Sequence, residues 1–313
     1  VFFPDGLLTP PSDEALKYDI EFLQKAGFNT IRKHIKIEPE RFYYHCDKMG
    51  MIVWQDAVCS SEYNLKDKNP GKDPHAAKQF EFELKQMIDQ LGNYPSIVMW
   101  VVFNEGWGQY GGKTLIDWTK EYDPSRLASV SGWVDFGNGD VCDVHRYPGP
   151  GRIENSGDGR AFVVGEFGGL GLPVQGHTWI ESDKNWGYET YTDVDVFRKN
   201  YEQMVFELDL LIDQGLSAAI YTQTTDVEVE TNGFLTYDRK VAKISDEDLN
   251  KLHKKLYEGK TAVKVYLPDS EKESQMWKYT FAEPQGDWFS ETYNDAKWKT
   301  GKVMIRRFSR TCA

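Results

Sequence analysis

The chain has 313 residues, which corresponds to about two domains at roughly 150 residues each. Its 40% hydrophobic and 27% charged residues are typical of a globular protein and exclude a largely disordered chain. The net charge of −12 argues against nucleic-acid and anionic-membrane partners, which favour a basic face, and no apolar run approaches the roughly 18 residues of a membrane span.

The first part of the chain alternates predicted helices and strands. Ser12, after two prolines, can cap a helix whose apolar residues recur at helical spacing until Gly27. The following elements are predicted as a strand at 28–31, a helix at 39–49, a strand at 51–54, a polar loop at 56–73 and a helix at 76–91. Residues 97–103 are apolar on both faces, which is typical of a parallel strand covered by helices.

The alternation continues to about residue 260. Predicted helices lie at 115–122, 194–213 and 245–257, and predicted strands at 127–130, 141–144, 162–164 and 216–221. The segment between Val130 and Val144 is too short for a crossover helix, so we expect a loop there. This pattern predicts an α/β fold with parallel strands, and a (β/α)₈ TIM barrel over residues 1–260 has the appropriate size.

The pattern changes at about Thr261. Val263, Val265 and Leu267 alternate with polar or aromatic residues, and tryptophans recur between turn signals. We therefore expect residues 261–313 to begin an all-β domain that is too short to be a complete sandwich. The start of the chain lacks an initiator Met and a signal peptide, which favours a fragment or a processed product, and the first barrel strand is expected upstream of Val1.

Aromatic residues and cysteines leave alternatives open. The 14% aromatic content suits either a large core or a cleft that stacks against sugar rings. The four cysteines have no C-x-x-C pair and no metal-ligand spacing, so each is interpreted as a thiol. No metal motif is present, and we predict neither a metal nor a cofactor.

Two glutamates follow predicted strands directly. Glu105 ends the run Phe103-Asn104-Glu105, and Glu166 follows 162–165; glycines come after both. Because the carboxyl ends of parallel barrel strands meet at one face, the two side chains are expected to lie together. Either Glu could instead cap a helix or pair with an Arg, but the combination favours a pair of catalytic carboxyl groups.

The motifs around these residues resemble glycoside hydrolase family 2. The segment 92–105, GNYPSIVMWVVFNE, is similar to the acid/base signature of that family, although Gly92 and Val101 depart from it. The segments 27–32, GFNTIR, and 51–56, MIVWQD, resemble its second and third strands, but His34 stands one position earlier than the usual His. The run 277–301 resembles the opening of a galactose-binding-type jelly roll, which implies a partial β-sandwich at 261–313.

The resemblance implies roles for individual residues. Glu105 would be the general acid/base and Glu166 the nucleophile of a retaining mechanism. Asn104 would bind the 2-hydroxyl of the sugar, and Arg32 would hold the nucleophile charged or serve only as a structural ion pair. The further residues implied in substrate binding are Asp56, Trp107, Trp133, His145, Tyr147, Trp179 and Gln223.

The sequence therefore predicts a retaining exo-β-glycosidase, best described as β-galactosidase-like, with a β-glycoside as its partner. A catalytically inactive carbohydrate-binding relative or fragment is the alternative, and an unrelated α/β barrel enzyme is a third hypothesis. The resemblance also favours a secreted or periplasmic location. The sequence leaves the sugar and the oligomeric state open.

Overall fold

The structure is a computed structural model, and it describes residues 3–4, 6–59, 74–105, 109–130, 137–152, 158–258, 274–288, 290 and 292–303. The chain divides into two compact units, Val1–Thr261 and Ala262–Ala313. Each unit is described by itself below. Within the described residues, no helix is long and apolar enough to cross a membrane.

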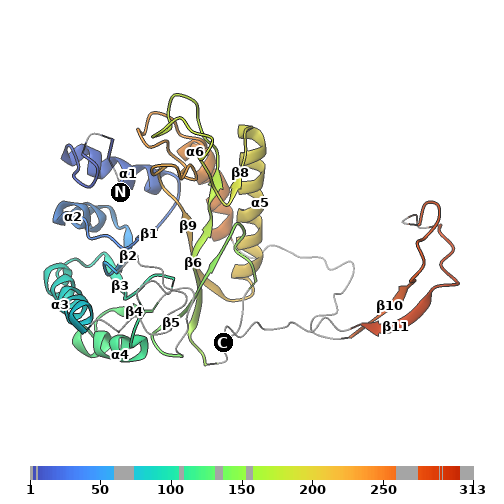
Figure 1. Cartoon of the computed structure of the whole chain (residues 1–313), viewed down its shortest axis with the longest axis horizontal. Coiled ribbons are helices and arrows are strands. Elements are labelled where there is room, and N and C mark those ends of the chain that lie inside the picture. Colours follow the sequence, from blue (N-terminus) through green and yellow to red (C-terminus); the bar gives the residue numbers. More distant parts are fainter. Residues whose placement is uncertain are drawn as a thin grey trace. The chain divides into compact units, whose positions relative to one another are not determined.

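The first unit contains two parallel sheets (Figure 1). One sheet has the order β1-β2-β3-β4, built from β1 (Thr30–Lys33), β2 (Ile52–Asp56), β3 (Ile97–Val101) and β4 (Leu127–Ser129). The other has the order β5-β6-β9, built from β5 (Val141–Arg146), β6 (Ala161–Gly168) and β9 (Leu216–Thr222). A short parallel pair, β7 (Leu170–Gly171) and β8 (Glu189–Thr190), follows β6. All strands of the two larger sheets run parallel, so their carboxyl ends lie on one face.

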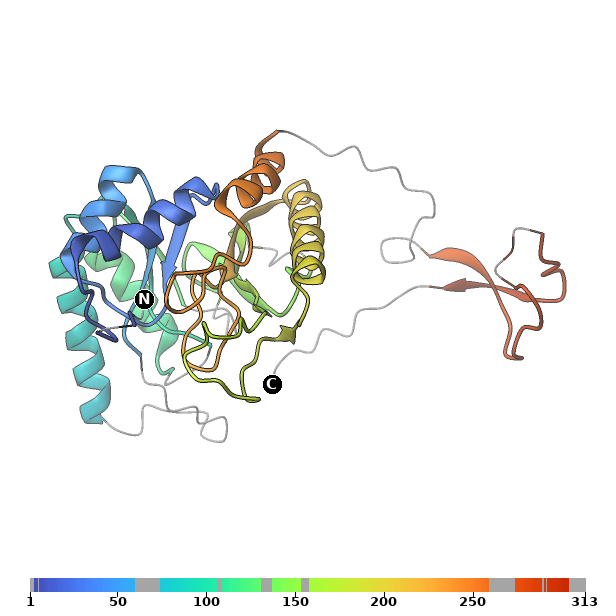
Figure 2. The ribbon, with the colours of Figure 1, turned by 90° about the horizontal axis from the view of Figure 1, so that it is seen from above.

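Helices cover the outside of these strands, as Figures 1 and 2 show. They are α1 (Asp13–Lys25), α2 (Glu40–Met49), α3 (Pro74–Leu91), α4 (Gly112–Tyr122), α5 (Val194–Ile212) and α6 (Asp246–Lys254), followed by the short helix η2 (Lys255–Tyr257). Side chains cap three of these helices at the start: Ser12 for α1, Asp193 for α5 and Ser245 for α6. Parallel strands alternate with helices that cover them, as the predicted α/β class requires.

Two hydrophobic clusters form the core. The larger lies between strands and helices and includes the fully buried Trp100, Tyr43 and Phe197. The smaller lies among the strands themselves and consists of Trp54, Met99, Val101, Val141 and Val163. Both faces of β3 are thus buried, which explains why residues 97–101 are apolar throughout. The described cysteines, Cys46, Cys59 and Cys142, are buried free thiols.

Strands β1 and β9 lie at the edges of their sheets. Among the described residues no strand pairs with the outer edge of either one. An apolar pocket of about 370 Å³ runs along both, with Thr30 and Ile52 on one side, Ala218 and Ile220 on the other, and Leu208 of α5. The barrel is therefore open between β1 and β9 in the part of the chain that the structure describes.

One predicted boundary is displaced for a clear reason. The strand predicted at 28–31 lies at Thr30–Lys33, because Gly27 and Phe28 complete the end of α1. The amide of Phe28 donates to the carbonyl of Leu23 and that of Gly27 to Gln24, with φ of +88° at Gly27. This hydrogen-bonding pattern is a common way to end a helix, and it requires the left-handed conformation that glycine adopts readily.

The second unit contains two described strands, β10 (Gln275–Tyr279) and β11 (Lys299–Val303). They pair antiparallel, with Trp277 opposite Gly301. The assignment of 261–313 as part of a β-sandwich of galactose-binding type stays a prediction.

Candidate active site

Polar side chains gather at the carboxyl ends of the barrel strands. They come from β1 (Arg32), β2 (Asp56), the turn after β3 (Asn104, Glu105), β5 (Asp143, His145), the segment after β5 (Tyr147), β6 (Glu166) and β9 (Thr222). This is the face of a parallel barrel on which βα loops build ligand sites. The structure thus brings together most of the residues that the sequence singled out.

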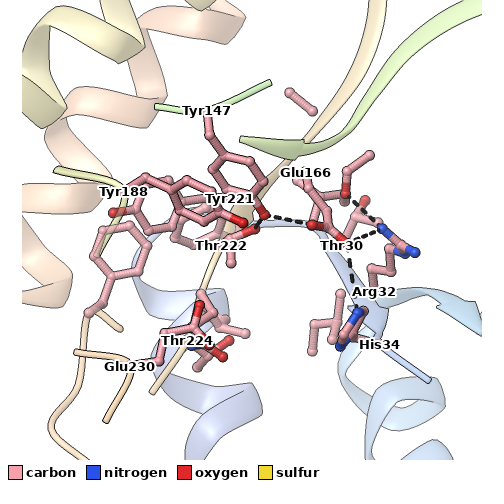
Figure 3. Close-up of a pocket in the computed structure, with 18 of the residues that line it drawn as sticks. Thr30, Arg32, His34, Tyr147, Glu166, Tyr188, Tyr221, Thr222, Thr224 and Glu230 are labelled. Atoms are coloured by element: carbon pink, nitrogen blue, oxygen red, sulfur yellow. Dashed lines mark hydrogen bonds and ion pairs between the residues drawn. The ribbon is translucent and has the colours of Figure 1, made fainter. Parts of the chain in front are cut away.

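Glu166 lies at the centre of this cluster (Figure 3). Its Oε1 accepts a hydrogen bond from Arg32 Nη1 at 2.8 Å, and its Oε2 accepts one from the hydroxyl of Tyr147 at 2.6 Å. The Nε2 atom of His34 lies 3.9 Å from Oε1. These donors orient both oxygens and stabilise the negative charge of the carboxylate.

Arg32 connects four parts of the site. It forms two hydrogen bonds with Asp56, at 3.0 and 2.8 Å, and its Nη2 also donates to Asn104 Oδ1 at 3.0 Å. Its Nη1 approaches His145 Nε2 at 3.1 Å as well as Glu166. Because the side chain is only 2% exposed, this guanidinium is fixed in place between two carboxylates.

Glu105 occupies a different environment from Glu166. Burial raises the pKa of Glu105, and the positive charges of Arg32 and His34 only partly oppose that effect. Its backbone φ is +45°, a left-handed conformation that costs about 1–3 kcal/mol in a non-glycine residue and is common at functional sites. A carboxyl group with a raised pKa, next to one held by cations, is the arrangement expected of an acid beside a charged carboxylate.

His145 links the two glutamates. Arg32 is a donor, so His145 Nε2 must accept from it, and the ring proton is assigned to Nδ1. Nδ1 lies 2.9 Å from Glu105 Oε1 and 3.4 Å from Glu166 Oε2. Burial lowers the pKa of His145 to about 3, so the ring is neutral and donates from Nδ1.

The ligand atoms of Glu105, His145 and Glu166 lie within 4.8 Å of one another. Three such atoms could hold a cation, but these groups already satisfy each other by hydrogen bonds, and Nδ1 of His145 carries a proton in this arrangement. The guanidinium of Arg32 next to Glu166 would also repel a cation. The cluster fits an acid/base pair better than a metal centre.

Asn104 has one unused hydrogen-bond donor. Its side chain is 1% exposed, and its Oδ1 accepts from Arg32. Its Nδ2 is buried and has no partner among the described residues. A buried donor without a partner costs about 1–3 kcal/mol. Asn104 itself does not line the pocket that the neighbouring Glu105 lines.

A pocket of about 370 Å³ opens above this cluster, and both glutamates line it. Its wall includes three residues that the sequence analysis missed: Trp186, Tyr188 and Glu230. The rings of Tyr188 and Tyr147 stack with centroids 3.6 Å apart. The short spacing of Trp186 and Tyr188, with Gly187 between them, was the one available signal in the sequence.

The remaining predicted residues divide into four groups. Gln223 lines the pocket, whereas Asp56 and His145 lie in the polar layer that holds its carboxylates. Trp179 does not line the pocket; its ring packs against Tyr237, with centroids 5.4 Å apart. Trp107 and Trp133 lie outside the described residues.

Comparisons with known proteins show what this chain is similar to. Residues 12–145 match the family model "Glycosyl hydrolases family 2, TIM barrel domain". Residues 12–145 are thus similar to the TIM barrel domain of glycoside hydrolase family 2, the family that the motifs of this chain resemble.

Several named proteins are similar to this chain. A β-galactosidase of Lactococcus lactis is 27% identical over 135 residues, which is 42% of this chain and 14% of that protein. A family 2 β-galacturonidase of Eisenbergiella tayi, solved with galacturonate, has a TM-score of 0.58 at 20% identity and covers 78% of this chain and 48% of its own. A β-D-glucuronidase of Dictyoglomus thermophilum has a TM-score of 0.59 at 17% identity, covering 79% and 48%. The chain therefore spans about half of these structures and a smaller part of the curated relative.

Proposed function

We propose that the chain carries the catalytic site of a retaining exo-β-glycosidase that removes terminal β-linked sugars. The observation that supports this most is the pair Glu105 and Glu166, because one carboxylate oxygen of each lies within 4.8 Å of one oxygen of the other. Retaining enzymes place their carboxyl groups about 5–5.5 Å apart, whereas inverting enzymes need about 6.5–9.5 Å. The curated relatives named β-galactosidase support a β-galactoside as the first substrate to test.

In the first step Glu166 attacks the anomeric carbon. The bond from that carbon to the glycosidic oxygen breaks, and Glu105 transfers its proton to the departing oxygen. Arg32 and Tyr147 hold the attacking carboxylate in position. Asn104 Nδ2 donates to the sugar 2-hydroxyl, where such a hydrogen bond strengthens in the transition state.

In the second step Glu105, now ionised, takes a proton from a water molecule. The water oxygen forms a bond with the anomeric carbon, and the ester bond to Glu166 breaks. His145 donates to Glu105 from Nδ1, which stabilises its charge at this stage. The anomeric configuration is retained because two inversions take place.

Covalent labelling tests the nucleophile. A 2-deoxy-2-fluoro β-galactoside with an activated leaving group should form a stable ester with the protein, and peptide mapping should place it on Glu166. A label on another residue would contradict the assignment. The same reagent series in the gluco and manno configurations covers the other neutral sugars.

Azide rescue tests the acid/base. Glu105→Ala should reduce hydrolysis of substrates with poor leaving groups most, and added azide should restore part of the activity as a glycosyl azide. The matched control is Glu121→Ala on an exposed part of α4, which should behave like the parent. If no β-glycoside is turned over while sugars still bind, the chain is instead a carbohydrate-binding relative.

A further inference from the structure

Glu230 places a third carboxylate in the pocket. It ends a tight turn in which its amide donates to Val227 O at 2.9 Å and Val227 N donates back at 3.0 Å. The same residue forms a parallel bridge to Trp186, which also lines the pocket. In Figure 3, Glu230 and Arg32 lie on opposite sides of the pocket. Two backbone pairings thus fix the position of this carboxylate.

The side chain of Glu230 is held by a buried amide. Asn232 is fully buried, and its Nδ2 donates to Glu230 Oε1 at 2.9 Å. The orientation of this amide is set by Gln223, whose Nε2 donates to Asn232 Oδ1 at 2.7 Å. A carboxylate has about four acceptor positions, so this anchored group retains capacity for further donors.

The charges around the pocket are distributed unevenly. Glu105, Glu166 and Glu230 all line it, and the negative charge of Glu166 adds to burial in raising the pKa of Glu230. The basic side chains among the described lining residues are Arg32 and His34, and both lie by Glu166. Arg32 is also bound to Asp56. Glu230 also lines a second pocket with Lys33, whose ammonium group is bound to Glu38. A second anion next to Glu230 would therefore meet a like charge, while Arg32 and Lys33 are already paired with other carboxylates.

We propose that Glu230 is a specificity-determining residue that accepts hydrogen bonds from sugar hydroxyls and rejects sugars that carry a carboxylate. The pocket then selects neutral pyranosides over uronic acids. This deepens the proposed function and rests on it for the identity of the pocket. This selectivity would distinguish the chain from the uronidases that have a similar fold. A similar fold at 20% identity does not imply the same substrate.

Binding of matched monosaccharides tests the proposal without requiring turnover. Glucose and glucuronate differ at carbon 6 alone, as do galactose and galacturonate. Titration calorimetry or ligand-observed NMR with the full chain should show at least tenfold tighter binding of the neutral member of one or both pairs. In Glu230→Gln, the ratio within that pair should fall by about five- to tenfold, because a hydrogen bond to a charged acceptor is stronger than one to a neutral acceptor and the repulsion is removed.

The matched control is Glu228→Gln. Glu228 is exposed, stands in the same turn and does not line the pocket, so this variant removes the same charge without touching the site. It should keep the wild-type ratio. A ratio that changes equally in both variants would indicate a general charge effect and overturn the proposal.

The wild-type comparison alone can also overturn it. Binding of a uronate as tight as that of its neutral partner, or no binding of any of the four sugars, contradicts the role of Glu230. If the chain binds the neutral member of a pair more tightly than the acidic member but hydrolyses no glycoside, the catalytic proposal is wrong and the role of Glu230 is supported. The two proposals are therefore tested separately.

Discussion

Arg32 binds Asp56 through two parallel hydrogen bonds inside the barrel, from Nε to Oδ1 at 3.0 Å and from Nη2 to Oδ2 at 2.8 Å. Asp56 itself is fully buried and also accepts from the amide of Ile35. Since Glu166 binds the same guanidinium, Asp56 sets the position from which Arg32 reaches the proposed nucleophile. The ion pair between Arg32 and Asp56 therefore contributes both to the stability of the fold and to the position of Glu166.

The variant Asp56→Asn tests this connection. It leaves a buried guanidinium with less compensating charge, which typically costs about 3–5 kcal/mol. Denaturant unfolding should show a lower midpoint at an unchanged slope. The control Asp117→Asn breaks the exposed pair with Lys113 and should leave the midpoint where it is. Equal midpoints in wild type and Asp56→Asn would contradict a stabilising role.

The hydroxyl of Tyr147 can be removed with little change in packing. Tyr147→Phe keeps the ring stacked on Tyr188 but removes the 2.6 Å hydrogen bond to Glu166. We expect kcat on aryl β-glycosides to fall by about 100-fold, the lower end of the loss that follows removal of one preorganised donor. The melting temperature should stay close to that of Tyr122→Phe, an exposed control whose hydroxyl binds Asp89. An unchanged kcat would show that the hydroxyl does not act on the nucleophile.

The pH dependence of turnover reports on Glu105. Because burial raises the pKa of this carboxyl group, it stays protonated to a higher pH than an exposed glutamate. The rate with a poor leaving group should fall as the pH rises through this pKa, since the proton donor is lost. With a dinitrophenyl glycoside, whose leaving group needs no proton, kcat/KM of the wild type should not show that alkaline decline. If the decline persists with this substrate, loss of the Glu105 proton does not cause it.

Asp143 makes the fold sensitive to pH. Burial raises the pKa of this carboxyl group to about 7, although the amide of Gly165 donates to its Oδ1 at 2.8 Å. In the unfolded chain its pKa is about 4, so below that pH both states are protonated and no difference arises. Between about pH 4 and 7 the unfolded state releases the proton and the folded state keeps it, so stability falls as the pH rises, by on the order of 2–4 kcal/mol.

The variant Asp143→Asn retains an oxygen for the amide of Gly165 and removes the ionisation. Its melting temperature should match that of the wild type near pH 4 and exceed it increasingly up to pH 8. Thermal unfolding at a series of pH values measures this difference. If the melting temperatures of the variant and the wild type differ by the same amount at every pH, the pKa of Asp143 does not change on folding.

Much of the fold and the centre of the site could be predicted from the sequence. Apolar runs bounded by glycine identify the parallel strands, and polar residues directly after them must lie at one face of the barrel. Arg32, Glu105 and Glu166 therefore lie together, although 61 residues separate the two glutamates. Each of these residues lies in or directly after a predicted strand, and that place along the strand determines its position at the face of the barrel.

The wall of the pocket could not be predicted in this way. Trp186 and Glu230 lie on loops whose paths depend on each other, since Trp186 N donates to Val229 O and Thr231 N donates to Trp186 O. The backbone there passes so closely that a Cβ on Gly187 would lie 2.4 Å from the amide of Gly171. Trp179, on the same loop, packs against Tyr237 and does not line the pocket. Its position also depends on contacts between loops, which no periodic pattern in the sequence predicts.

The buried cysteines have a consequence for chemical modification of the protein. Burial raises the pKa of the Cys46 thiol to about 12 and that of the Cys59 thiol to about 11. Because the thiolate is the reactive form of cysteine, a thiol reagent reacts with these residues only when the surrounding structure opens. The rate of their modification therefore reports local unfolding of the barrel.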